Sequence, residues 1–123
     1  MNSHPERAQD YLEHIITALE RIQRYSTGKS EIDFLTDTLL QDAVLRNLGI
    51  IGEAAHCLLA DAPEFAATHP EIPLAKIYAT RNRITHAYED VDMEIVWNLV
   101  VQDVPALKPK IAAAIEELRE GTG

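Results

Sequence analysis

The stretch Arg81-Asn82-Arg83-Ile84-Thr85-His86-Ala87-Tyr88 ends a segment, Pro73–Tyr88, whose apolar residues recur at helical spacing. This spacing predicts a helix that buries one face, and the positions on that face are Leu74, Ile77, Tyr78, Ile84, Thr85 and Tyr88. Arg81 falls on the same face, where an aliphatic side chain is expected. Because an arginine is costly to remove from water unless it is paired, its position indicates a functional site or an interface.

A straight helix would separate the polar residues of this stretch. At about 100° per residue, Arg81 and Tyr88 lie roughly 20° apart around the axis, whereas His86 lies roughly 140° from Arg81. Asn82 and His86 are four positions apart and are therefore neighbours on the helix surface. Either the helix ends or distorts before His86, or the site combines residues of two protomers. A symmetric homodimer with two such helices side by side is compatible with both.

The residue types suit the cleavage of RNA without a metal ion. A histidine titrates near neutral pH, so His86 can act as general base on a ribose 2′-OH or as general acid on the leaving oxygen. The guanidinium of Arg81 can hold the phosphate and stabilise charge in the transition state, and Asn82 can orient the imidazole. On spacing alone the commoner outcome is a structural arginine paired with a core carboxylate, beside an ordinary histidine.

The composition predicts one globular domain over residues 1–123. Of the 123 residues, 46% are hydrophobic, which is enough for a core without disulfides or metal. No apolar run approaches the roughly 18 residues that span a bilayer, and the N-terminus lacks a signal pattern. The single cysteine, Cys57, cannot form an internal disulfide, so we expect a cytoplasmic location. The net charge of −9 argues against general, charge-driven nucleic-acid binding, so any RNA contact would be local or supplied by a partner.

The first predicted helix begins near the N-terminus. Ser3 and Glu6 have the spacing of a capping box, and the helix runs to about Tyr25. Gly28 ends it in a short polar turn. The inward positions of this helix are Ala8, Leu12, Ile15, Ala18 (or Leu19) and Ile22.

The second predicted helix is the longest. Ser30 and Asp33 form another capping box, from which one continuous helix reaches about Ala60. Ala62-Pro63 stops it, and residues 68–73 are predicted to form a loop before the helix that carries the polar stretch.

The last predicted helical segment starts near Asp90–Asp92 and ends near Gly121. Pro105 is expected to kink or split it near Asp103, because proline lacks a backbone donor. Its apolar positions are Val96, Leu99, Val100, Leu107, Ile111, Ala114, Ile115 and Leu118. No segment has the alternating pattern of a strand, so the fold class is all-α, an up-and-down bundle of four or five helices.

The second helix presents two faces. The core face comprises Leu40, Ala43 with Val44, Asn47, Ile51, Ala54 with Ala55, and Leu58, and the opposite face comprises Asp42, Arg46, Gly49, Glu53 and His56. Charged residues on an outer face are most often simply solvated. Gly49 and Gly52, however, each cost about 1 kcal/mol relative to alanine inside a helix, so they predict close approach of another backbone or a ligand. Glu53 and Asp42 are candidates either to line a cleft or to pair with Arg81.

Other candidate sites are weaker. Glu53-x-x-His56 has the spacing of a di-iron bundle site, but the further pairs which such a site needs are missing, so we expect no metal. No glycine-rich phosphate loop is present, and no cofactor is expected. Cys57 is interpreted as a small buried residue. The remaining histidines are interpreted as surface or helix-end residues: His4, His14 and His69.

Three blocks of the chain together resemble a known family. The polar stretch resembles the Arg-x4-His-x-Tyr signature of HEPN-superfamily toxins of the HepT type. Residues 42–54 are similar to that family's second-helix signature. The third block comprises Val91-Asp92, Ile95-Val96-Trp97 and Asp103-Val104-Pro105. The likeness covers residues 5 to 115 approximately, and three blocks in the right order make it specific.

The resemblance implies a homodimeric, all-helical HEPN domain that acts as a metal-independent endoribonuclease. Such proteins are the toxins of type VII toxin–antitoxin systems, with tRNA as a reported target class and the paired motifs in a cleft at the dimer interface. The partner antitoxin is a minimal nucleotidyltransferase that transfers AMP from ATP to a tyrosine of the motif. The alternative is a non-catalytic HEPN dimer that binds a nucleotidyltransferase or nucleotides; a purely structural four-helix protein is the third interpretation.

Carried onto this sequence, the resemblance assigns catalysis to Arg81 and His86, with support from Asn82. Tyr88 takes the position of the tyrosine that receives AMP. In some relatives that tyrosine lies two residues after the arginine, where this chain has Arg83. Where relatives often carry tryptophan early in the motif helix, this chain has Leu74, a difference of packing rather than chemistry. The further residues expected to line the cleft are Arg83, Glu53, Asp42 and Arg46.

Overall fold

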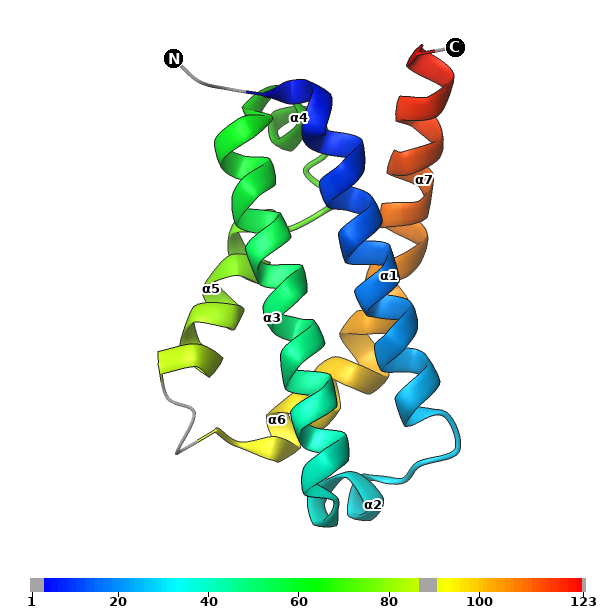
Figure 1. The fold of residues 1–123 in the computed structure, drawn as a ribbon, viewed down its shortest axis with the longest axis vertical. Coiled ribbons are helices and arrows are strands. Elements are labelled where there is room, and N and C mark those ends of the chain that lie inside the picture. The colour runs from blue at the N-terminus through cyan, green and yellow to red at the C-terminus, as the bar shows by residue number, and fades with distance from the viewer. Residues whose placement is uncertain (1–3, 87–90, 123) are drawn as a thin grey trace.

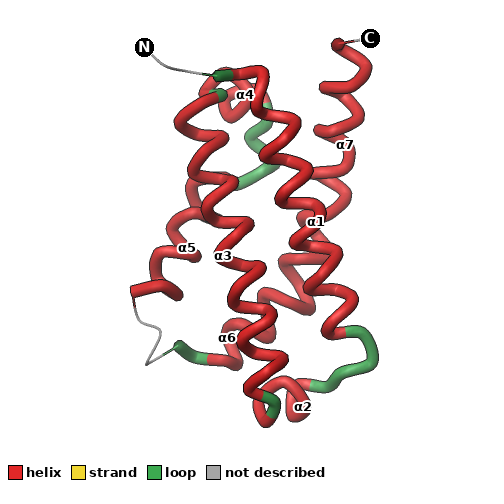
Figure 2. Tube along the Cα trace, in the orientation of Figure 1, coloured by secondary structure: helices red, strands yellow, loops and turns green. Residues whose placement is uncertain are grey.

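The computed structural model describes residues 4–86 and 91–122, which form helices joined by turns and contain no strand. The long helices are α1 (Ala8–Ser26), α3 (Thr38–Asp61), α5 (Leu74–His86) and α7 (Val104–Thr122). They run alternately down and up, with both chain ends at the same end of the bundle (Figure 1). The shorter elements are η1 (Pro5–Arg7), α2 (Glu31–Thr36), α4 (Pro63–Thr68), α6 (Met93–Asn98) and η3 (Leu99–Asp103). The helical trace in Figure 2 confirms the predicted all-α, up-and-down bundle.

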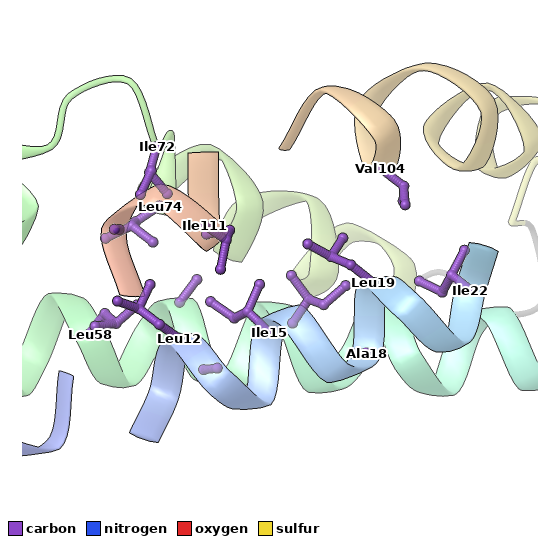
Figure 3. Packing of buried hydrophobic residues seen from close by; sticks show 14 of the residues in the cluster. Leu12, Ile15, Ala18, Leu19, Ile22, Leu58, Ile72, Leu74, Val104 and Ile111 are labelled. Carbon is purple, nitrogen blue, oxygen red and sulfur yellow. The ribbon is translucent and has the colours of Figure 1, made fainter. Parts of the chain in front are cut away.

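The core lies between α1, α3 and α7, with Leu74 at the start of α5 (Figure 3). Leu12, Ile15 and Ile22 of α1 are fully buried, as are Leu58 of α3 and Ile111 of α7. Every inward position predicted for the first helix is buried. Burying one such aliphatic side chain stabilises the fold by about 1.5–3 kcal/mol, so this helical stripe holds the bundle together.

The chain enters α1 differently from the prediction. Ser3 lies outside the described residues, so the proposed capping box is not tested there. The α-helix begins at Ala8 after the 3₁₀ turn η1, and the residue before it makes no side-chain cap. The backbone N–H of His4 instead donates to the carbonyl of Asp61 at 2.8 Å, and the Tyr11 hydroxyl donates to the Asp61 carboxylate at 2.5 Å. His4 and the first turn of α1 are thus hydrogen-bonded to the last residue of α3.

The predicted long second helix is in fact two helices. Gly28 has φ +75° in the preceding turn, and the capping box of Ser30 and Asp33 is present, with both hydrogen bonds made. The helix then breaks at Asp37, whose extended backbone and carboxylate cap a new helix through a 3.1 Å bond from the Leu40 N–H. The continuous helix predicted from residue 30 to 60 is therefore wrong, because Asp37 is a second cap.

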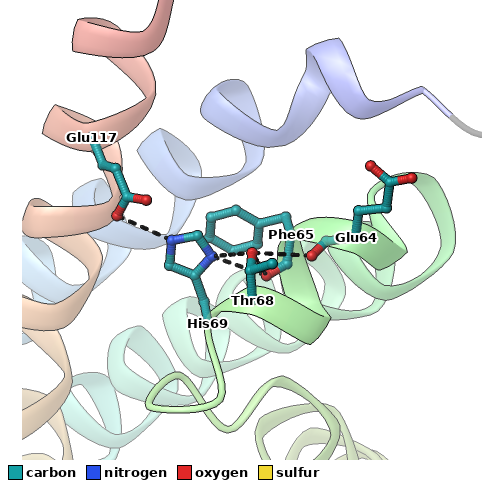
Figure 4. A network of polar contacts seen from close by, with 5 residues as sticks. All are labelled: Glu64, Phe65, Thr68, His69 and Glu117. Carbon is teal, nitrogen blue, oxygen red and sulfur yellow. Dashed lines mark hydrogen bonds and ion pairs between the residues drawn. The ribbon is translucent and has the colours of Figure 1, made fainter.

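The segment after α3 also differs from the prediction. Pro63 ends α3 as expected, but it then occupies the first turn of the short helix α4. His69, which follows α4, is only 7% exposed, so its interpretation as a surface residue was wrong. Its ring stacks on Phe65 with centroids 4.0 Å apart, and its Nε2 lies 3.2 Å from the carboxylate of Glu117 on α7 (Figure 4). The same interpretation allowed a helix-end position for His69, and this is confirmed, because His69 caps the C-terminus of α4.

His69 is held in a way that favours its protonated form. Its Nδ1 lies 3.0 Å from the Phe65 carbonyl oxygen, while Nε2 faces the Glu117 carboxylate. The Phe65 carbonyl and the Glu117 carboxylate are both acceptors, and a neutral imidazole can donate to only one of them. The Thr68 hydroxyl also lies 3.0 Å from Nδ1. Burial opposes the charge, but these two acceptors outweigh it and raise the pKa of His69 above its ordinary value.

The last segment divides as predicted. Asp92 caps α6 by accepting a 2.9 Å bond from the Glu94 N–H, while Asp90 lies outside the described residues. A π-helical turn, η3, covers Leu99–Asp103, and α7 begins at the next residue with Pro105 in its first turn. The expected break near Asp103 is confirmed, and α7 reaches Thr122.

By length and composition α3 passes as a possible membrane span, with a mean hydropathy of 1.3, in contrast to the expectation that no such segment exists. A helix at the centre of a bundle meets the same criteria, and α3 packs against α1, α4 and α5. The predicted core stripe, which is apolar apart from Asn47, is buried except for the half-buried Ala43.

Candidate functional site

Arg81 of α5 lies directly against Gly52 of α3. Gly52 of α3 is buried, and a Cβ added to it would overlap Cβ and Cγ of Arg81. Glycine at this position therefore lets the two helices approach, as predicted. Nothing in the described part of this protomer lies within 4 Å of the position that a Cβ at Gly49 would take, so close approach of a ligand or of a second copy at Gly49 stays a prediction. The inward arginine thus rests on the backbone of α3.

Two oxygen atoms hold the guanidinium of Arg81. Its Nη2 forms an ion pair with Glu53 of α3, and its Nη1 donates to Oδ1 of Asn82 at 3.1 Å. The side chain of Arg81 is 23% exposed and that of Glu53 is 56% exposed, so the pair lies at the edge of the solvent. Of the two roles left open for Glu53, pairing with Arg81 is present in the structure, and lining a cleft stays a prediction. A guanidinium has more N–H groups than these contacts use, so donors remain for an anionic ligand.

Two aromatic side chains, one on α5 and one on α3, stack on each other next to Arg81. Tyr78 lies one turn before Arg81 on α5, with its ring centroid 5.6 Å from the guanidinium carbon. The exposed ring of His56 on α3 stacks on Tyr78, with centroids 4.4 Å apart and an angle of 24° between the planes. Spacing placed Tyr78 on the core face and His56 on the outer face, and gave no sign that they meet. Such a contact depends on how α5 is rotated against α3.

Of the remaining predicted site residues, three are exposed on the surface and two have side chains outside the described residues. Asp42, Arg46 and Arg83 are exposed, and none of them forms an ion pair within residues 4–86 and 91–122. His86 is the last residue of α5; its side chain, like all of Tyr88, lies outside the described residues. The assignments of His86 and Tyr88 therefore stay predictions. The structure brings together Arg81, Asn82 and Glu53.

An apolar cavity of about 230 Å³ opens beside Arg81. Leu19 of α1 and Ile51 of α3 line it, together with Ile84 of α5 and Leu107 of α7. Within the described residues α5 packs chiefly on α3, so the side of α5 that faces α7 is not filled by the protomer itself. The site thus combines the paired guanidinium of Arg81 with an open apolar cavity.

The candidate metal pair is engaged elsewhere. Glu53 pairs with Arg81 and His56 stacks on Tyr78, and the described part of the chain contains no cluster of three ligand-type side chains suited to a metal ion. Cys57 is half-buried rather than fully buried. Burial, followed by the nearby carboxylates of Glu53 and Asp61, raises the pKa of its thiol. It is therefore a poor nucleophile.

Comparison with known proteins identifies the class. Residues 15–114 match the family model described as "Ribonuclease HepT-like", and the chain therefore belongs to the HepT-like ribonuclease family. No solved structure matches the chain.

Individual relatives agree with this family. The protein named "Probable ribonuclease HepT" of Thermococcus cleftensis is 40% identical over 91% of this chain and 96% of its own length. A Caldanaerobacter subterraneus protein whose name proposes an RNase is 32% identical over 87% of this chain and 93% of its own length. A Methanocaldococcus jannaschii protein, whose name joins a gamma-glutamylcyclotransferase to a proposed RNase, is 39% identical over 88% of this chain. The match spans 47% of that longer protein, about half of its length.

Proposed function

We propose that the chain is a metal-independent endoribonuclease, the toxin of a type VII toxin–antitoxin pair, with tRNA as its target class. One observation carries the proposal: in a chain of the HepT-like ribonuclease family, Arg81 is held at the solvent edge by Glu53 and Asn82, over a glycine that admits it. Held in this way, the guanidinium is ready to bind a phosphate without first being ordered.

The proposed chemistry divides between two residues. Arg81 binds the scissile phosphate and stabilises the negative charge that develops on its oxygens. His86 removes the proton from the neighbouring 2′-OH, which then attacks phosphorus, and an imidazolium donates a proton to the departing 5′ oxygen. Asn82 binds Arg81 through its oxygen, which leaves its NH₂ group for His86 one turn later.

We also propose that the active unit is a homodimer. Within the described residues α5 packs chiefly on α3, and an open apolar cavity separates it from α7 beside Arg81. A second copy packed there would cover apolar surface and place two motifs in one cleft. It would also resolve the angular separation of Arg81 and His86 expected for a straight helix.

Regulation in this proposal acts on Tyr88. AMP transferred from ATP by a minimal nucleotidyltransferase would add bulk and a negative charge within one helical stretch of Arg81. The charge would compete with RNA phosphate for the guanidinium, and the nucleotide would occlude the cleft. An acidic protein, with a net charge of −9, would thus be controlled at its local cationic site.

The catalytic assignment is tested by incubating the purified chain with total RNA in EDTA and sequencing the new ends. His86→Ala and Arg81→Ala should abolish cleavage and growth inhibition. His14→Ala changes an exposed histidine on α1 and should leave both intact. Full activity of His86→Ala would overturn the mechanism.

The dimer is tested by mixing the two inactive variants. If Arg81 and His86 act across protomers, Arg81→Ala and His86→Ala chains together should recover activity that neither shows alone. Light scattering of the wild-type chain should give the mass of a dimer. A monomeric mass, or no recovery on mixing, would contradict a shared site.

The modification is tested by intact-mass measurement after incubation with the antitoxin and ATP. The wild-type chain should gain the mass of AMP, Tyr88→Phe should not, and Tyr25→Phe on α1 should behave as the wild type. If Tyr88→Phe were still silenced with no adduct elsewhere, the assignment of Tyr88 would be wrong.

One observation favours the non-catalytic alternative. The ion pair with Glu53 neutralises part of the charge on which phosphate binding by Arg81 depends. In a module that only binds a nucleotidyltransferase or nucleotides, this pair would be permanent. Binding of such a partner by a wild-type chain that cleaves no RNA would establish that alternative.

A further inference from the structure

The stacked rings of Tyr78 and His56 lie next to the proposed phosphate-binding arginine. Tyr78 contacts both groups: its centroid is 4.4 Å from that of His56 and 5.6 Å from the guanidinium carbon of Arg81. The two rings come from different helices, Tyr78 from α5 and His56 from α3. A flat aromatic surface and a cation therefore meet at one point of the surface.

Burial shows which ring faces solvent. Tyr78 is half-buried between the helices, whereas His56 is exposed. The structure has a second stack of this kind, between Phe65 and His69. The His69 ring differs from that of His56, because it is buried and has hydrogen-bond partners at both nitrogens. The His56 ring has no hydrogen-bond or ion-pair partner in the described part of the chain, so its outer face and its nitrogens are open to a ligand.

We propose that His56 and Tyr78 form a stacking platform for one nucleobase of a single-stranded RNA, beside the phosphate that Arg81 binds. Single-stranded RNA is recognised mainly by bases that stack on aromatic side chains, including histidine. The base lies on the outer face of His56, Tyr78 supports that ring from below, and Arg81 holds the backbone. This platform rests on the proposed ribonuclease function and adds to it a preference for unpaired RNA.

The platform also answers an electrostatic difficulty. At a net charge of −9, general attraction does not bring RNA to this chain. Base stacking needs no positive charge and is sequence-tolerant, because every base has a flat face. Stacking thus supplies local affinity that the charge of the protein does not.

The test is a binding measurement in the His86→Ala background, which prevents cleavage of the probe. Fluorescence anisotropy of a labelled single-stranded adenosine RNA is compared with that of the same strand with abasic sites. His56→Leu keeps the size and loses the flat ring, and should weaken binding of the adenosine strand about tenfold. His56→Phe keeps a stacking ring and should bind as well as His56 does.

The matched control is His14→Leu, which removes an exposed histidine from α1. It should bind the adenosine strand unchanged, and the abasic strand should bind all variants with equal, low affinity. Tyr78→Leu, which preserves burial, should weaken binding as His56→Leu does, with thermal unfolding confirming that it is folded.

The outcomes separate the two proposals. If the parent chain binds and the wild type cleaves RNA, but His56→Leu binds the adenosine strand normally, the platform is wrong and the ribonuclease stands. If His56→Phe fails as His56→Leu does, the imidazole acts by hydrogen bonding or charge, and stacking is again wrong. If no RNA binds and none is cleaved by the wild type, the proposed function and the platform both fail.

Discussion

Arg81 occupies the space that a side chain at Gly52 would need. Its Cβ and Cγ lie where a methyl group on Gly52 would be placed, and its guanidinium continues to Glu53, the next residue of α3. One turn of α3 therefore supplies both the space for the arginine and the carboxylate that holds it. The position of Arg81 therefore depends on the packing of α5 against α3.

Gly52→Ala should destabilise the fold and impair the site. Overpacking costs about 1–3 kcal/mol, offset by about 1 kcal/mol of improved helix propensity, and Arg81 must move away. The free energy of unfolding, measured in urea, should fall, and RNA cleavage should fall with it. Gly49→Ala is the matched control, since its added methyl meets nothing within 4 Å. It should raise stability by up to about 1 kcal/mol. Equal stability of the two variants would contradict the close packing.

Arg81→Lys should lower RNA cleavage by about 100-fold or more, while barely changing stability. Lysine keeps the charge but cannot bind Glu53, Asn82 and a phosphate together. The ion pair is partly exposed, so its loss should cost less than about 1 kcal/mol of unfolding free energy. Cleavage rates on gels and thermal unfolding measure the two effects. Arg21→Lys, on the exposed face of α1, should change neither. Wild-type rates in Arg81→Lys would show that charge alone suffices.

The contact between His69 and Glu117 should make stability depend on pH. Because the pKa of His69 is raised in the fold, its contribution is complete below its unfolded value of about 6.5 and is lost as pH rises through the folded value. In urea, the free energy of unfolding of the wild type should therefore exceed that of Glu117→Gln at about pH 5.5. This difference should disappear above the folded pKa of His69. The other charged group that faces the ring is Glu71, whose effect both proteins share.

Glu120→Gln provides the control for this measurement, because Glu120 is an exposed carboxylate on α7. Its stability should follow that of the wild type at every pH. A gap between the wild type and Glu117→Gln that is constant with pH would show that the contact does not depend on protonation of His69.

Cys57 should react slowly with iodoacetamide in the folded protein. Burial and the nearby carboxylates raise its pKa, so little thiolate is present at neutral pH. Since the chain has one cysteine, the mass of a single adduct reports the rate directly. The rate should increase on unfolding in urea. Equal rates in the folded and unfolded protein would contradict a suppressed thiolate.

Periodicity predicted what depends on one helix at a time. The buried face of α1, the capping box at Ser30, the break before α7 and the close approach at Gly52 are confirmed. Each of these follows from residues within a few positions of one another, or from the lack of a side chain. The inward position of Arg81 was predictable for the same reason, because it follows from the spacing within one helix.

One local cap and the contacts between distant segments were not predictable in this way. Asp37 occupies one polar position in a helical pattern, and only its extended backbone shows that it caps α3. His69 looks like a loop residue until Glu117, 48 positions later, lies beside it. The stack of His56 on Tyr78 depends on the rotation of α5 about its own axis, which spacing does not fix.

The packing of α5 chiefly on α3 has a consequence for hydrogen exchange. A helix with one main neighbour detaches at a smaller cost than one enclosed on several sides, so its amides should exchange through local opening before those of α1. Tyr88 follows the end of α5 by two positions. In the proposed regulation, an enzyme that modifies Tyr88 would reach it through local opening of α5, without unfolding the rest of the bundle.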